Sequence, residues 1–103
     1  MNKRLSARDR RDELLNAALI VAARPGGWAA LTRASVAKEA QCSDALVSAH
    51  FGTMIEFRRS VMRAAIKRRA LSVIAQGVAS ADRTALHAPP ELKREAMGDL
   101  IGG

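Results

Sequence analysis

The segment Thr32–Gly52, which reads TRASVAKEAQCSDALVSAHFG, decides the fold of this chain. It predicts two short helices, over residues 33–40 and 44–51. Thr32 precedes the first helix and Ser43 precedes the second. The hydroxyl of either residue can accept a hydrogen bond from the free amides of a first helical turn. The segment therefore holds two capped helices in immediate succession.

The connection between these helices is as informative as the helices themselves. Only Gln41 and Cys42 separate the first helix from the cap of the second. Gly52 is expected to end the second helix, because glycine adopts a positive φ without steric cost. Two short helices across so brief a turn are typical of the helix-turn-helix unit, whose second helix enters the major groove of DNA.

The composition supports an all-α fold. The chain has 103 residues, enough for one domain with a modest core. Alanine, leucine and arginine are abundant, whereas there are two phenylalanines, one tryptophan and no tyrosine. The 17 lysines and arginines outnumber the 10 acidic residues and give a net charge of +7. A balance this basic favours nucleic acid or an anionic membrane surface as partner.

The basic residues gather on either side of the predicted pair of helices. Residues 1–11 contain five basic residues and one acid, and residues 54–69 contain six basic residues and one acid. Both clusters lie where contacts to phosphate groups would support the insertion of a helix into DNA.

The sequence gives little indication of a disulfide, a metal site, an enzyme active site or a membrane span. The single cysteine, Cys42, excludes an internal disulfide and a cysteine-based zinc site, and we interpret it as a small apolar core residue. There are no paired carboxylates, nucleophile–base pair or phosphate loop at usable spacing, so no enzyme, cofactor or metal site is expected. The sequence has neither a run of about 18 apolar residues nor a secretory signal, which predicts a cytoplasmic protein without a membrane span.

The N-terminal half is predicted to be an arm followed by three helices. Residues 1–8 are expected to form a flexible basic arm. A first helix is predicted over Asp9–Ala23, and Pro25–Gly27 ends it because proline cannot continue a helix. Trp28 is expected to anchor the core. Residues 9–53 would then form a three-helix helix-turn-helix DNA-binding domain.

Residues 54–103 are predicted to form a helical dimerisation region. Thr53 can cap a long fourth helix that continues over residues 54–80, with Gly77 as a soft spot. A short last helix begins near Pro90 and is too short to stand alone in water. The apolar surplus of these helices predicts a dimer interface formed by Leu71, Ile74, Val78, Leu92 and Leu100.

Several short motifs follow one another in order between residues 10 and 66. They are LLNAALIVAA at residues 14–23, Gly27-Trp28, Leu31-Thr32, Val36-Ala37, Ala40, Ser43 and His50-Phe51-Gly52. This ordered combination resembles the TetR family of bacterial transcription regulators. In that family the third helix reads the major groove, the fourth leads to a ligand-sensing domain, and the protein binds a palindromic operator as a dimer.

The resemblance implies two sets of residues that contact DNA. Base readout is implied for Ser43, Asp44, Ala45 and Ser48. Contacts to the DNA backbone are implied for Lys3, Arg4 and Arg8 of the arm, and for Thr32, Arg33, Ala49, His50, Thr53 and Arg58.

The chain departs from the family pattern at four positions. Gln41 stands at the usual turn glycine and costs up to about 1 kcal/mol if the turn needs a positive φ. Asp44 and Met54 each replace a common lysine, and Ser48 replaces a tyrosine. Asp44 could accept a hydrogen bond from a cytosine amino group. The family's sensing domain has no counterpart before Gly103, so a small-molecule effector is not expected.

These features predict a sequence-specific DNA-binding regulator, most simply a repressor that binds a palindromic operator in double-stranded DNA as a homodimer. The alternative is a protein-interaction module that modulates another regulator or enzyme, which Asp44, Met54 and the apolar surplus of the fourth helix favour. A helix on a membrane surface over residues 54–78 is a further alternative, because basic and apolar residues interleave there. A steep salt dependence of DNA affinity would argue against the interaction module.

Overall fold

A computed structural model describes the backbone of residues 6–102 and the side chains of residues 6–98. Within that range the chain is all helical and contains no strand, which confirms the predicted fold class. The helices are α1 (Ala7–Ala23), α2 (Arg33–Ala40), α3 (Asp44–Phe51), α4 (Met54–Arg68), α5 (Leu71–Ala79), α6 (Arg83–Leu86) and α7 (Pro90–Gly102).

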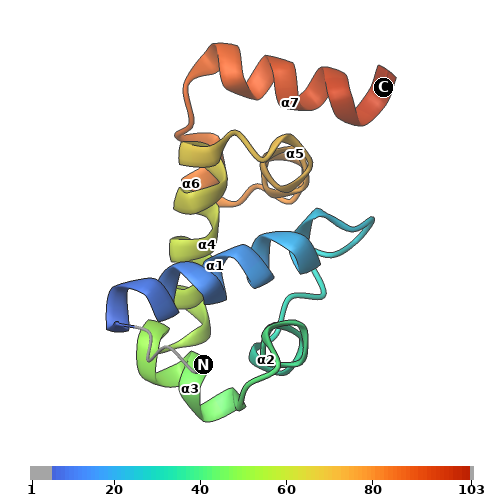
Figure 1. Ribbon diagram of the computed structural model, residues 1–103. Coiled ribbons are helices and arrows are strands. Elements are labelled where there is room, and N and C mark those ends of the chain that lie inside the picture. Colours follow the sequence, from blue (N-terminus) through green and yellow to red (C-terminus); the bar gives the residue numbers. More distant parts are fainter. Residues whose placement is uncertain (1–5, 103) are drawn as a thin grey trace.

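The helices form two groups that share α4 (Figure 1). In the view of Figure 1, α1, α2 and α3 lie in the lower half and α5, α6 and α7 in the upper half, while α4 runs between them. Helix α1 packs against α2, α4 and α5, and α3 packs against α2 and α4. Helix α7 packs on α5. The molecule is elongated, with extents of 44 × 24 × 21 Å.

One continuous hydrophobic core joins the two groups. It extends from Leu14 in α1 to Ala96 in α7. Trp28 is buried, as predicted for a core anchor, and its backbone N–H donates to Oε1 of Gln76 at 3.0 Å. Nε2 of Gln76 in turn donates to the carbonyl of Ala22 at 2.8 Å. Gln76 thereby fixes the loop after α1 onto α5.

The predicted helix caps are confirmed. The Thr32 hydroxyl accepts from the Ser35 amide at 3.0 Å, and the Ser43 hydroxyl accepts from the Leu46 amide at 3.2 Å. Thr53 and Glu56 form a reciprocal capping box at the start of α4. These interactions satisfy amides that a helix start leaves without a backbone partner.

The start of α1 differs from the prediction. Ser6 caps this helix by accepting a hydrogen bond from the Asp9 amide at 3.1 Å. Arg8 is therefore a residue of α1 and not of a flexible arm. Lys3 and Arg4 lie outside the described residues.

The predicted long fourth helix is wrong, because the chain turns at Arg69. This residue has a left-handed conformation with φ 56°, and the Ala70 amide donates back to the Ala65 carbonyl at 2.8 Å. Such a backward bond is typical of helix C-termini. The turn directs the apolar residues of α5 onto α1, α4 and α7, so they complete the core of the chain itself.

Gly77 is a close-packing position rather than the soft spot that we predicted. It lies inside α5, and a Cβ atom added there would meet Ala85 Cβ at 2.8 Å and Met62 Cε at 2.4 Å. The absence of a side chain lets α5 approach α4 and the short helix α6. Helix α6 was not predicted; Asp82 caps it by accepting from the Ala85 amide at 3.0 Å.

The packing of α7 on α5 corrects two assignments to a dimer interface. Ile74 and Leu92 are buried by neighbouring helices of the same chain, so they are core residues of the protomer. Leu71 and Val78 are partly exposed on α5. The side chain of Leu100 lies outside the described ones. None of the described helices combines the length and apolar character that crossing a membrane requires.

Candidate nucleic-acid interface

Helix α3 has one buried side and one exposed side. Val47 and Phe51 are buried against the core. Asp44, Ala45 and Ala49 are exposed. Asp44 forms no side-chain hydrogen bond or ion pair with any residue that the structure describes. The exposed side is therefore short, weakly polar and unoccupied by other parts of the described chain.

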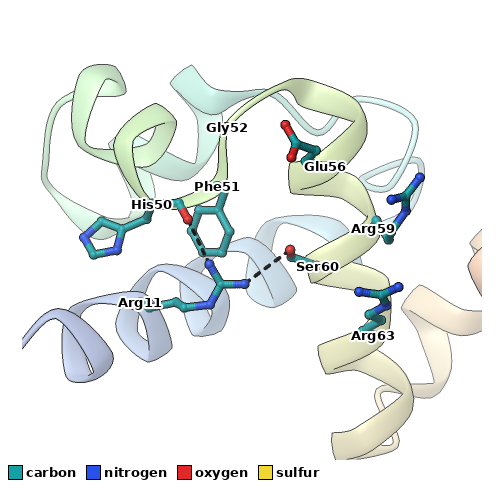
Figure 2. Close-up of a pocket in the computed structure, with 8 residues that line it drawn as sticks. All are labelled: Arg11, His50, Phe51, Gly52, Glu56, Arg59, Ser60 and Arg63. Atoms are coloured by element: carbon teal, nitrogen blue, oxygen red, sulfur yellow. Dashed lines mark hydrogen bonds between the residues drawn. The ribbon is translucent and has the colours of Figure 1, made fainter.

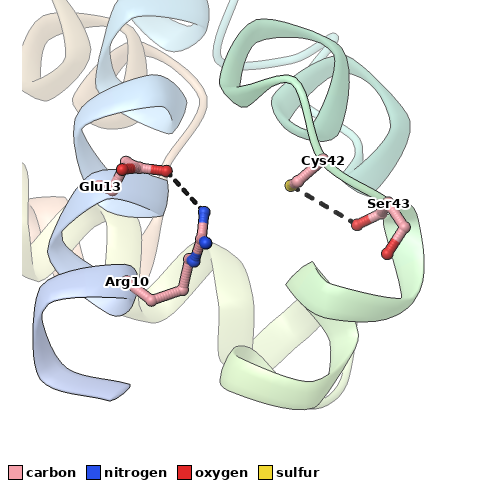
Figure 3. Close-up of polar contacts among 4 residues, drawn as sticks. All are labelled: Arg10, Glu13, Cys42 and Ser43. Carbon is pink, nitrogen blue, oxygen red and sulfur yellow. Dashed lines mark hydrogen bonds and ion pairs between the residues drawn. The ribbon is translucent and has the colours of Figure 1, made fainter. Parts of the chain in front are cut away.

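The turn before α3 has the conformation that a glycine would favour. Gln41 adopts φ 58° and ψ 49°, which is the left-handed conformation. Its φ is positive, so glutamine at this position is less favourable than the glycine of the family pattern. The Cys42 amide donates to the Ala37 carbonyl at 2.9 Å. Cys42 packs against the core without being fully buried, and its Sγ lies 3.6 Å from the Ser43 carbonyl (Figure 3).

Ser43 and Ser48 are the other two residues predicted to read bases. The Ser43 hydroxyl acts as the cap of α3 and is exposed at the same time. Its proton is thus free to be donated while the oxygen accepts from the backbone. Ser48 is half-buried on α3.

The residues predicted to contact the DNA backbone differ in how much of each side chain is exposed to solvent. Thr32 and Thr53 are exposed, and their hydroxyls accept from the helix starts that they cap. Arg33 donates from Nη2 to the Gly52 carbonyl at 3.0 Å, and its Nε is buried without a partner among the described residues. Arg33 therefore ties the start of α2 to the end of α3. His50 is half-buried.

Arg58, which we predicted to contact the DNA backbone, is half-buried and held by the loop after α1. Its guanidinium carbon lies 4.1 Å from the centroid of the Trp28 ring. Nη2 donates to the Trp28 carbonyl at 2.7 Å, and Nη1 donates to the Leu31 carbonyl at 3.4 Å. Burial lowers the pKa of Arg58. The residue is part of the packing between α4 and the loop after α1.

A polar groove that the sequence did not reveal lies where α1, α3 and α4 meet (Figure 2). Its volume is about 390 Å³. It is lined by Arg11, His50, Phe51, Gly52, Glu56, Arg59, Ser60 and Arg63. Two signals were available: the two basic clusters, and the spacing of Arg59 and Arg63, which places two arginines on the same side of a helix.

Arg11 organises this groove. Its guanidinium carbon lies 4.4 Å from the centroid of the Phe51 ring. Nη1 donates to the His50 carbonyl at 2.9 Å, and Nη2 donates to the Ser60 hydroxyl at 3.3 Å (Figure 2). Arg11 thereby joins α1 to the last turn of α3 and to α4.

Basic side chains on the described surface are of two kinds, those paired with a carboxylate and those without such a pair. Four arginines away from the groove are paired with carboxylates: Arg10 with Glu13 (Figure 3), Arg24 with Glu39, Arg68 with Asp12, and Arg69 with Glu95. Arg59 and Arg63 are exposed and form no ion pair with any described residue. Two of the free positive charges of α4 therefore lie near the end of α3, while Lys67, also exposed and without an ion pair to a described residue, lies in the last turn of α4.

Glu56 is the acid that lines the groove. Its Oε1 accepts from both the Thr53 amide and the Thr53 hydroxyl, at 3.0 Å each. These hydrogen bonds lower the pKa of Glu56, with a smaller contribution from the charge of Arg59. The carboxylate is thus committed to the start of α4. Residues 6–98 bring together no group of histidine, cysteine and acidic side chains that could hold a metal ion.

No protein-family model, curated protein or solved structure matches this chain. The likeness to TetR regulators therefore rests on the motifs quoted from the sequence and stays a prediction.

Proposed function

We propose that this protein is a sequence-specific DNA-binding transcription regulator, with α2 and α3 as its helix-turn-helix unit and α3 as the recognition helix. The observation that carries the proposal is the juxtaposition of α3 and the groove. The exposed side of α3 ends beside two free arginines, Arg59 and Arg63. An unoccupied helix face next to free cations has the two properties that insertion into a major groove requires.

The exposed residues of α3 suit contacts to base edges. The Asp44 carboxylate can accept from the exocyclic amino group of cytosine, and the methyl group of Ala45 can contact a thymine methyl group. The Ser43 hydroxyl can donate to a base acceptor. Phosphate contacts come from residues around this helix, because α3 itself contains no lysine or arginine.

The regulator is proposed to act as a homodimer. One helix of eight residues makes few base contacts, so two copies on half-sites about 34–36 Å apart would supply the affinity. The corresponding operator is palindromic. Occupation of such a site within a promoter would block transcription, which makes a repressor the simplest form of the proposal.

The test is selection of bound duplexes from a random DNA library, with the mass of the protein in solution measured in parallel. We expect a palindromic consensus and a dimer on DNA. The matched control is Ala45→Glu, which places a negative charge on the exposed side of α3 and should abolish enrichment while the helical content stays unchanged. Failure of the native chain to enrich any sequence would refute the proposal.

A second candidate function is a protein-interaction module. Ile55, at the start of α4, has 72% of its surface exposed, which is unusual for so large an apolar side chain. The acid Asp44 is exposed on α3 and would repel phosphates. Absence of enrichment in the DNA selection, together with association of a protein partner that Ile55→Glu prevents, would favour this candidate.

A further inference from the structure

The groove between α1, α3 and α4 has the chemistry of an anion site. Three guanidinium groups line it, from Arg11, Arg59 and Arg63, and the backbone carbonyl of His50 accepts a hydrogen bond from Arg11. The one carboxylate in its lining, that of Glu56, accepts two hydrogen bonds from Thr53. Positive charge therefore exceeds negative charge, and the negative group is already engaged.

Arg11 is prepared for a second partner. A guanidinium has five N–H donors, and the structure uses one on Nη1 and one on Nη2. Stacking on Phe51 fixes the plane of the group. An anion that approaches Arg11 meets donors whose side-chain entropy is already lost, which favours binding.

Arg59 and Arg63 supply the exposed part of the site. They are four residues apart on α4 and therefore about 6 Å apart along its axis. Both are exposed and free of carboxylate partners among the described residues. Guanidinium groups bind phosphate oxygens through paired hydrogen bonds, which gives arginine its advantage over lysine at such sites.

The position of the groove indicates which phosphate it would hold. His50 and Gly52 belong to the C-terminal end of α3, and both line the groove. The N-terminal end of α3 carries Asp44, which phosphate would repel. The two ends of α3 therefore differ in their preference for the DNA backbone.

We propose that this groove binds a backbone phosphate of the DNA strand that passes the C-terminal end of α3, with Arg59 and Arg63 as its ligands and Arg11 as the fixed donor. The proposal rests on the proposed DNA binding and deepens it by fixing the direction of α3. The start of α3 faces the base pairs, and its end lies against the backbone.

The experiment compares four proteins on one duplex over a range of salt concentrations. They are the native chain, Arg59→Ala/Arg63→Ala, Arg59→Lys/Arg63→Lys, and the control Lys93→Ala/Arg94→Ala. The control removes the same charge from α7, which packs on α5, remote from the groove. Circular dichroism verifies the fold of each variant, and the exposed positions of Arg59 and Arg63 make folding of the first variant the expected result.

We expect the slope of log affinity against log salt to fall by about 1 per subunit for the alanine pair, since both arginines hold one phosphate and each neutralised phosphate contributes about 0.9. The lysine pair and the α7 control should keep the native slope. A native slope for the alanine pair would overturn the proposal. If the α7 control lowered the slope as much as the alanine pair does, the proposal would also be overturned, because the loss of any two positive charges would then explain the lower slope.

Two further measurements separate this inference from the proposed function. If the native chain enriches no sequence but binds duplex with a slope that the alanine pair reduces, the groove proposal stands and sequence-specific regulation fails. If the native chain binds no duplex, both fail. Binding of inorganic phosphate that the alanine pair abolishes, with an unchanged slope on DNA, would assign the groove to a free phosphate compound and overturn the assignment to DNA.

Discussion

The guanidinium of Arg58 lies against the indole of Trp28 and also donates to the carbonyl of the same residue, at 2.7 Å. One side chain of α4 therefore holds both the ring and the backbone of the loop after α1. Burial lowers the pKa of Arg58, and the charge of Asp82 opposes that effect. The guanidinium stays protonated at neutral pH, because the ordinary pKa of arginine lies far above 7. Arg58 is thus a half-buried cation whose partners are an aromatic face and two carbonyls.

Replacing Arg58 with alanine should destabilise the fold by about 2 kcal/mol or more, because it removes a cation–π contact and charged hydrogen bonds. Urea unfolding at 25 °C measures the change in the free energy of unfolding. The neighbouring variant Arg59→Ala is the control and should leave that free energy within about 0.5 kcal/mol of the native value. Equal stabilities for the two variants would contradict a structural role for Arg58.

The capping box of α4 should make stability depend on pH. Hydrogen bonds from Thr53 lower the pKa of Glu56 below 4.5, so the ionised carboxylate favours the folded state. This contribution is present above the unfolded pKa and disappears as the pH falls through the folded pKa. The variant Glu56→Gln should therefore be less stable than the native chain at neutral pH, and the difference should vanish in acid.

Chemical denaturation of both proteins at a series of pH values tests this expectation. Glu91→Gln serves as a control, since Glu91 is exposed in the first turn of α7 and forms no ion pair with a described residue. A difference between Glu56→Gln and the native chain that persists unchanged in acid would contradict the assignment.

Two helical glycines should respond in opposite directions to alanine. Gly77→Ala should destabilise by about 1–3 kcal/mol, since the new Cβ would lie 2.8 Å from Ala85 Cβ. Gly98→Ala should stabilise by up to about 1 kcal/mol, because nothing lies within 4 Å of its added Cβ and alanine favours a helix. Thermal unfolding of the two variants tests the pair; a gain in melting temperature for Gly77→Ala would contradict the close packing of α5.

The turn between α2 and α3 offers a stabilising substitution. Gln41 has a left-handed backbone, which costs an L-residue about 1 kcal/mol relative to glycine. Gln41→Gly should therefore raise the free energy of unfolding by about that amount. Lys38→Gly, in the exposed interior of α2, should lower it by a similar amount. The sign of the difference between these variants in a denaturant titration decides the prediction.

Asp44 should determine one base of each half-site. Asp44→Ala removes the carboxylate that we propose accepts from cytosine, so the preference at that position should weaken by about 1–3 kcal/mol. The comparison is a selection from a randomised site library with the native chain, with Asp44→Ala and with Glu91→Ala. The last variant loses the same charge on α7 and should keep the native consensus. An identical consensus for Asp44→Ala would show that this residue reads no base.

The caps could be predicted from sequence because each depends on residues three positions apart. Thr32, Ser43 and Thr53 all precede helix starts, and each accepts a hydrogen bond from the amide three residues later. Gly52 ends α3 with φ 74°, a conformation that its lack of a side chain permits. Local rules of this kind need no knowledge of the tertiary structure.

The break at Arg69 and the stacking of Arg58 could not be predicted in this way. Arginine and alanine favour helices, so residues 69 and 70 carry no stop signal; the turn occurs because it places α5 on the core. Arg58 meets Trp28 across thirty positions of sequence. The same difficulty affects the groove, since Arg11, His50 and Arg63 come from three helices.

The shortness of α2 and α3 has a consequence for how the exposed side of α3 is lost on heating. Each has eight residues, and an isolated helix shorter than about 12 residues barely persists in water. Val47 and Phe51 therefore maintain the shape of α3 by their burial in the common core. The exposed side of α3 and the core consequently melt as one unit, and a temperature that disrupts the hydrophobic interior also removes the shape of that side.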